Sequence, residues 1–164
     1  MKKPALLLLP LIACASYSAS AHETDHWDQY ETLATNISKT VKTAPLDKLT
    51  KQSIELTQLS TQLIPAFIEQ HPICKGYLTA ALGASNKMTS LSLEDIEKDY
   101  HADGKLPAVK SAKCYHAKDL LVHPATMAVI GKTQQDTKQT RQQMADELEE
   151  VLEHFNQVKS AAGI

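Results

Sequence analysis

The sequence predicts an all-α fold, namely an antiparallel four-helix bundle with a long, disulfide-pinned crossover between its third and fourth helices. Three observations lead to this prediction. The composition favours helix, with only five glycines and 5% aromatic residues. Apolar side chains recur every three or four residues along four stretches, which is the spacing of one helical face. Two cysteines, Cys74 and Cys114, flank the one long connection.

The first residues have the layout of a secretory leader. Two lysines precede an apolar run, and a small-residue stretch ends at Ala21 in an A-x-A cleavage pattern. We therefore expect residues 1–21 to be a signal peptide and residues 22–164 to form a single helical-bundle domain. An alternative stays open, because the residues before Cys14 also fit a lipoprotein box in which Cys14 would carry a lipid anchor.

Two stretches predict the first pair of helices. One helix is expected from Glu23 to Thr43, ended by Pro45, and a second is expected to begin at Asp47. Pro65 lies inside the second pattern, and because proline removes a backbone hydrogen bond we expect a kink or an end one turn early. The apolar stripes are Trp27, Tyr30, Ala34, Ile37 and Val41, then Leu49, Leu56, Leu59, Leu63 and Phe67.

A third helix is expected to begin at Pro72, a residue suited to the first helical position, and to run to Met88. Regular pattern is then lost as far as Lys113, apart from a short helix that Ser92 could cap. A connection this long inside one domain is unusual and often functional. The side chains expected on the buried face of the third helix are Ile73, Tyr77, Ala80, Ala81, Ala84 and Met88.

The chain after Cys114 predicts a short helical run that breaks or kinks at His123-Pro124. One long fourth helix is expected to follow and to end at Gly163. Its middle, residues 133–143, is weakly apolar. The stripe of this helix is Met127, Ile130, Thr137, Arg141, Met144, Leu148, Val151, Leu152, Phe155 and Val158.

The charge balance argues against nucleic acid as a partner. The net charge is −2 at pH 7, and it becomes more negative once a leader with two lysines is removed. Phosphate contacts need clustered lysine and arginine, which this chain lacks. After the leader no apolar run approaches the roughly 20 residues that span a bilayer. We therefore expect no transmembrane segment.

Cys74 and Cys114 are expected to form a disulfide, because an exported chain meets an oxidising compartment. The bridge would close a long loop and stabilise the fold by about 4 kcal/mol on the chain-entropy model. It would also bring His71 and His116 within roughly 10 Å of each other.

A metal site is the chemical hypothesis that the histidines support. His116, Asp119 and His123 fall at i, i+3 and i+7, on one face if the helix is unbroken, and His71 would join them through the disulfide. Imidazole and carboxylate together suit zinc or copper. The competing interpretation is structural, since His71 and His123 both precede a proline and Asp119 at i−4 can form a plain pair with His123.

Two other ligand sets stay open. His71 and Cys74 with Cys114 and His116 have the residue types of a tetrahedral zinc site, although disulfide formation competes with it. Haem could bind without a covalent link, whereas covalent c-type haem is excluded because there is no Cys-x-x-Cys-His motif. The axial haem ligands that the helices offer are Met88, Met127, Met144, His123 and His154.

The long connection also holds a candidate pocket rim. Tyr100 and His101 lie in a short polar run, and Tyr115 follows the second cysteine. Loops held by a rigid scaffold often carry binding residues. The alternative is a solvated turn.

We therefore expect an exported, periplasmic binding or accessory protein that holds a zinc ion, a copper ion or haem near the Cys74–Cys114 bridge. A binding role is favoured over an enzymatic one, because no nucleophile-elbow, phosphate-loop or Cys-x-x-Cys motif occurs and no residue is assigned as catalytic. The alternative function is a structural or protein-partner-binding module, including a homo-oligomer, without a small ligand.

Overall fold

The computed structural model describes the backbone of residues 19–164 and the side chains from residue 26 onward. The described residues are helical and contain no strand, so the all-α prediction is confirmed. The leader cleavage after Ala21 and the lipid anchor at Cys14 fall outside the described side chains and stay predictions.

Six α-helices form the described part of the chain, so the expected count of four is wrong. A 3₁₀ turn, η1, precedes α3, and a π-helical turn, η2, continues α4. The bounds are α1 Ala19–Thr40, α2 Leu46–Gln70, η1 Pro72–Cys74, α3 Lys75–Met88, α4 Leu93–Ile96, η2 Glu97–His101, α5 Ala112–Thr133 and α6 Lys138–Ala162.

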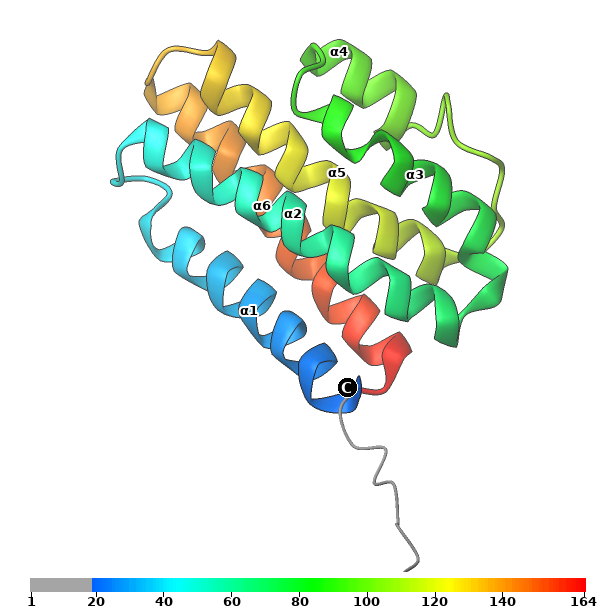
Figure 1. The fold of residues 1–164 in the computed structure, drawn as a ribbon. Coiled ribbons are helices and arrows are strands. Elements are labelled where there is room, and N and C mark those ends of the chain that lie inside the picture. Colours follow the sequence, from blue (N-terminus) through cyan, green and yellow to red (C-terminus); the bar gives the residue numbers. More distant parts are fainter. Residues whose placement is uncertain (1–18) are drawn as a thin grey trace, which may run out of the picture.

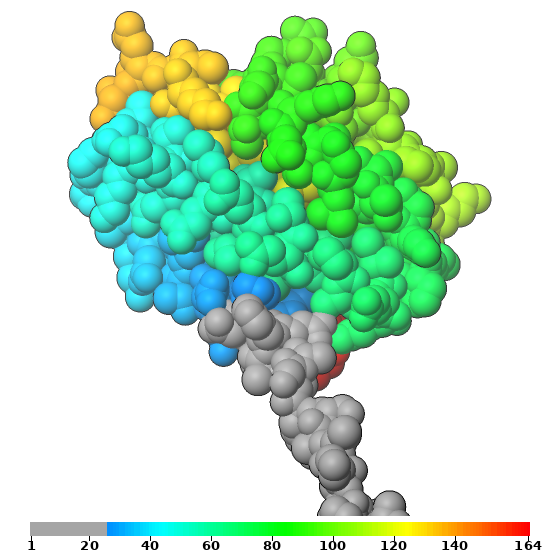
Figure 2. Space-filling model, in the orientation of Figure 1, coloured from blue at the N-terminus to red at the C-terminus, as the bar shows by residue number. Residues whose placement is uncertain are grey.

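Helix α5 is the centre of the packing. It lies against α2 on one side and α6 on the other, and α1 contacts both of these helices (Figure 1). Helix α3 packs on α5 and α2 from outside this group. Figure 2 shows the α3 and α4 region beside the surface of α2. The Tyr30 ring stacks on the Phe155 ring with centroids 5.2 Å apart, which ties α1 to α6 in the core.

Helix α5 runs through Pro124 to Thr133, so of the break or kink expected at His123-Pro124 the break does not occur. Proline removes the hydrogen bond that would go to the carbonyl four residues earlier, on Leu120. That carbonyl instead accepts hydrogen bonds from the Tyr30 hydroxyl at 2.9 Å and from the Ser60 hydroxyl. The two side chains replace the missing donor, and the helix continues. Helix α2 likewise passes through Pro65 and ends at Gln70.

The expected long fourth helix is also wrong, because it is divided between α5 and α6. The break falls after Thr133, in the weakly apolar stretch, and Thr137 caps α6 by accepting a hydrogen bond from the Thr140 amide at 3.1 Å. Within α6, Arg141 donates to the carbonyls of Val41 and Ala44 and so holds the turn after α1.

The crossover from α3 to α5 begins as expected, whereas one side chain just before α3 differs. Ser92 caps α4 by accepting from the Asp95 amide at 3.1 Å. Ile73, expected to be buried, is 71% exposed. The residue lies in the 3₁₀ turn, whose three residues per turn shift the phase, so that Cys74 faces the core instead.

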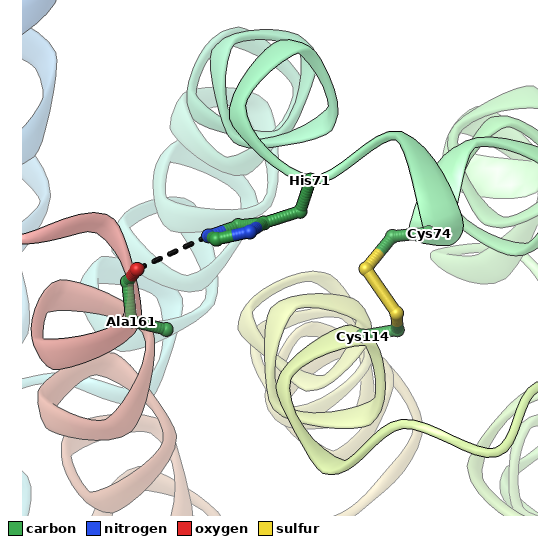
Figure 3. The surroundings of a disulfide bond; sticks show 4 residues. All are labelled: His71, Cys74, Cys114 and Ala161. Atoms are coloured by element: carbon green, nitrogen blue, oxygen red, sulfur yellow. Dashed lines mark hydrogen bonds between the residues drawn. A yellow bond between two sulfur atoms is a disulfide. The ribbon is translucent and has the colours of Figure 1, made fainter.

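The predicted disulfide is present and joins Cys74 at the end of η1 to Cys114 in the first turn of α5, with Cα atoms 5.2 Å apart (Figure 3). Both half-cystines are fully buried. In the part of the chain that the structure describes, no helix is both long enough and apolar enough to cross a membrane.

Gly131 lies where α5 comes close to Thr50 of α2, and its replacement by alanine is expected to destabilise the fold by about 1–3 kcal/mol through overpacking. An added Cβ would lie 2.1 Å from Thr50 Oγ1 and 3.1 Å from Thr50 Cβ. Gly83, in α3, has no atom near an added Cβ, so Gly83→Ala should instead raise the free energy of unfolding by about 0.5–1 kcal/mol. Urea unfolding of both variants measures this difference, and equal effects would contradict the close packing.

Candidate metal centre

A buried polar cluster lies where η2, α5 and α6 meet. We call it the histidine cluster and define it by His101 from η2, Asp119 and His123 from α5, and His154 from α6. Asp119 is fully buried, and His123 and His154 are nearly so. The His123 ring centroid lies 5.1 Å from that of His101 and 5.2 Å from that of His154. Three imidazoles and one carboxylate are thus gathered from three elements.

The three imidazoles share one arrangement, in which Nδ1 is already engaged. Nδ1 lies within hydrogen-bond distance of Glu97 Oε2 for His101 (2.7 Å), of Glu147 Oε2 for His123 (2.8 Å) and of His116 Nδ1 for His154 (2.7 Å). A ring whose Nδ1 is held in this way keeps Nε2 for another partner and is fixed in direction. In metal sites a carboxylate often holds the second nitrogen of a histidine ligand in this way, as Glu97 and Glu147 hold His101 and His123 here.

The atoms left over are buried and lack hydrogen bonds. Neither carboxylate oxygen of Asp119 accepts a well-directed hydrogen bond, and His123 Nε2 has no partner. The Lys118 ammonium lies 2.9 Å from Asp119 Oδ1, so the carboxylate has an ion-pair partner although the hydrogen-bond direction is poor. Buried polar atoms without hydrogen bonds cost about 1–3 kcal/mol each. Buried atoms of this kind are the ones that a bound ion would satisfy.

The environment shifts two pKa values in the cluster. Burial raises the pKa of Asp119 above its ordinary value, and the nearby Lys118 charge only partly opposes this. Burial, followed by the positive charges that His123 and His116 would carry, lowers the pKa of His154 to about 3. His154 is therefore neutral at physiological pH, which is the form that binds metals.

Lys118 is a fully buried lysine that fixes the end of η2. Its ammonium donates to the Tyr100 carbonyl at 3.0 Å and to the His101 carbonyl at 2.9 Å. It also lies 3.3 Å from Asp103 Oδ1 and 4.4 Å from the centre of the Tyr115 ring. The backbone that carries His101 is therefore anchored to α5.

The spacing of the ligand atoms is close to that of a filled site. One ligand atom each from His101, Asp119 and His123 lie within 4.8 Å of one another, as do those of His123, Glu150 and His154. His154 Nε2 is 3.7 Å from Asp119 Oδ2, which links the two groups. A tetrahedral zinc ion with ligands at about 2.0–2.1 Å separates them by about 3.4 Å. Contraction of the widest of these separations by about 1.4 Å would bring each group of three to tetrahedral spacing.

The predicted site residues are only partly brought together. Asp119 and His123 lie in the cluster, and His116 lies behind His154 as its Nδ1 partner. His71 is elsewhere, with Nε2 3.1 Å from the Ala161 carbonyl, and Figure 3 shows its ring turned toward α6 and away from the sulfurs.

The residues expected at a pocket rim lie next to the cluster. His101 is itself a candidate ligand. Tyr100 offers its backbone carbonyl to Lys118, and the Tyr115 ring centroid is 5.7 Å from that of His154. The disulfide confines the segment that bears Tyr100 and His101, because both lie between its two cysteines.

Three residues of α6 were not assigned to the metal site by sequence reasoning. Glu147, Glu150 and His154 fall at i, i+3 and i+7, the same spacing that His116, Asp119 and His123 have on α5. The same spacing on two helices was the signal in the sequence that could have pointed to these three residues. The sequence alone suggests His154 only as an axial haem ligand.

A second pattern with zinc-ligand spacing occurs near the start of α1. His22, Glu23 and His26 match the His-Glu-x-x-His spacing of zinc proteases. The side chains of residues 22–25 lie outside the described part of the structure, so no site is built on them.

Comparison with known proteins gives no assignment. No protein-family model, no curated protein and no solved structure matches this chain.

Proposed function

We propose that this protein binds one divalent transition-metal ion through His101, Asp119, His123 and His154. The observation that carries the proposal is the set of three imidazoles whose Nδ1 atoms are already engaged, gathered around the buried carboxylate of Asp119, which accepts no well-directed hydrogen bond and is paired with Lys118. Metal-binding histidines have this arrangement, with the outer nitrogen held and the inner nitrogen left for the ion.

The donor types favour zinc or copper. Imidazole suits these borderline ions, whereas calcium and magnesium prefer sites made of oxygen alone. A single ion also fits better than haem, since the neighbouring rings are only 5.1 and 5.2 Å apart and leave no room for a porphyrin between them.

The local charge supports a cation. The carboxylates of Glu97, Glu147 and Glu150 each contact a histidine of the cluster. The nearby ammonium of Lys118 is shared with another carboxylate, that of Asp103. Negative charge therefore exceeds positive charge around the cluster, and a divalent ion would reduce this excess.

A binding role is favoured over catalysis. Five surface hollows of about 130 to 510 Å³ lie on the described residues, and none of these five includes a member of the histidine cluster in its lining. Enzyme sites are ordinarily concave pockets that enclose the substrate.

We also propose that the protein acts after export, with the periplasm as the compartment. The leader-like first residues and the Cys74–Cys114 disulfide support this, because structural disulfides persist in oxidising compartments.

Calorimetric titration of metal-free protein with zinc tests the proposed function. We expect one zinc ion per chain, and we expect His123→Ala to weaken binding by more than about 100-fold, because loss of a ligand should exceed the 10 to 100-fold cost of losing an outer-shell partner. His71→Ala is the matched control, since this histidine lies outside the cluster and should leave zinc affinity unchanged.

Wild-type protein that takes up no zinc and no copper would contradict the proposal. So would equal losses of affinity in the His123 and His71 variants. Magnesium and calcium, added in place of zinc, should give no saturable heat.

A further inference from the structure

Given the metal site proposed above, we propose that His101 is its exchangeable ligand, so that the ion enters and leaves past the His101 ring on the η2 side. An external donor would take the coordination position that His101 vacates. The other three ligands would stay in place throughout.

Exposure separates His101 from the other candidate ligands. Its side chain is 33% exposed, whereas those of Asp119, His123 and His154 are 0%, 5% and 7% exposed. The His101 ring packs edge-on against His123, whose Nε2 is buried. Solvent therefore reaches the inner ligands most directly where this ring lies.

The side chain of His101 is held weakly although its backbone is held firmly. Its Nδ1 partner, Glu97, is 68% exposed and lies on the same short turn. Exposed ion pairs contribute only about 0–1 kcal/mol. The His101 carbonyl, in contrast, accepts a hydrogen bond from buried Lys118. The ring can thus swing outward while η2 remains docked on α5.

The opposite side of the cluster is built differently. His154 belongs to a long helix of the core, its Nδ1 is bound to His116, and its ring stacks on His123 with an interplanar angle of 15°. The exposed carboxylate of Glu150 is 3.7 Å from His154 Nε2. If this carboxylate moved away, it would uncover the His154 ring, but the ring itself would stay fixed. Among the four ligands only His101 comes from outside α5 and α6.

Zinc kinetics test this role. The rate constant for release is measured by stopped-flow transfer of zinc from the loaded protein to the chelator 4-(2-pyridylazo)resorcinol, and the entry rate constant follows from release and affinity. We expect His101→Ala to keep one zinc per chain and to raise the entry rate constant by about tenfold or more, since the ring no longer covers the site. Glu97→Gln keeps His101 as a ligand but holds its ring less firmly. This variant should raise the entry rate constant by a smaller factor.

His154→Ala is the matched control. Removal of a ligand that does not cover the site should speed release without changing the entry rate constant. An unchanged entry rate constant in His101→Ala would overturn the inference while the metal site stands, as would complete loss of zinc binding in that variant. Faster entry in Glu150→Gln than in His101→Ala would place the route on the other side and overturn it too. Wild-type protein that binds no zinc would overturn the proposed function itself, and this role of His101 with it.

Discussion

Replacing Asp119 with asparagine is expected to weaken zinc binding by more than about 100-fold while making the metal-free protein more stable at pH 7. Burial raises the pKa of Asp119 above its ordinary value of 3.8. A raised carboxyl pKa contributes stability below the unfolded-state value, and this contribution is lost as pH rises through the folded-state value. Desolvation of the ionised form therefore costs stability, and asparagine has nearly the same shape without a charge to desolvate. Calorimetric zinc titration and urea unfolding measure the two effects.

Asp136→Asn is the matched control for Asp119. A hydrogen bond from Arg141 lowers the pKa of Asp136, so this carboxylate contributes stability above its unfolded-state pKa, and its loss should lower the stability at pH 7. Zinc affinity should not change, since Asp136 lies outside the cluster. An Asp119→Asn variant that is less stable than the wild type and binds zinc normally would show that this carboxylate is a structural ion-pair partner of Lys118 and not a ligand.

The double replacement Cys74→Ser and Cys114→Ser is expected to lower the free energy of unfolding by about 4 kcal/mol, because the bridge closes a segment with a sequence separation of 40. Zinc affinity should fall as well, since His101 lies on this segment and would be less well placed. Urea unfolding of the variant beside oxidised wild-type protein measures the first effect, and zinc titration of the folded variant measures the second.

A matched comparison separates the bridge from the serine substitutions. Wild-type protein unfolded in urea with a strong phosphine reductant should show the same loss of stability once both thiols are free. If neither treatment lowers the stability, then the disulfide does not restrain the crossover, and the placement of His101 must come from Lys118 and the buried side chains of η2 alone.

Local periodicity predicted the outer helices well and α5 poorly. The residues of α1 and α2 alternate between one buried and one exposed face, so their stripes are visible in the sequence. Most of α5 from Cys114 to Ile130 is buried on all sides, which removes the stripe. Its passage through Pro124 depends on hydroxyls 90 and 60 residues away, on Tyr30 and Ser60, which no local pattern reveals.

The residues of the proposed metal site were predictable in part. The spacing of His116, Asp119 and His123 placed them correctly on one helix face once α5 proved continuous. The sequence groups His71 with them because the disulfide brings its part of the chain close to the start of α5. However, the His71 ring points from the end of α2 toward the Ala161 carbonyl. Assigning His154 to the site requires knowing that α6 packs against α5. Local sequence patterns do not reveal this packing.

Anomalous X-ray diffraction at the zinc absorption edge, from a crystal of the zinc-loaded protein, tests the proposed site most directly. We expect one strong peak between η2, α5 and α6, at about 2.0–2.2 Å from His123 Nε2, His154 Nε2 and an oxygen of Asp119. A peak beside His71 and the disulfide, or peaks only on exposed carboxylates, would contradict the proposal that this helical protein is built around a buried metal ion.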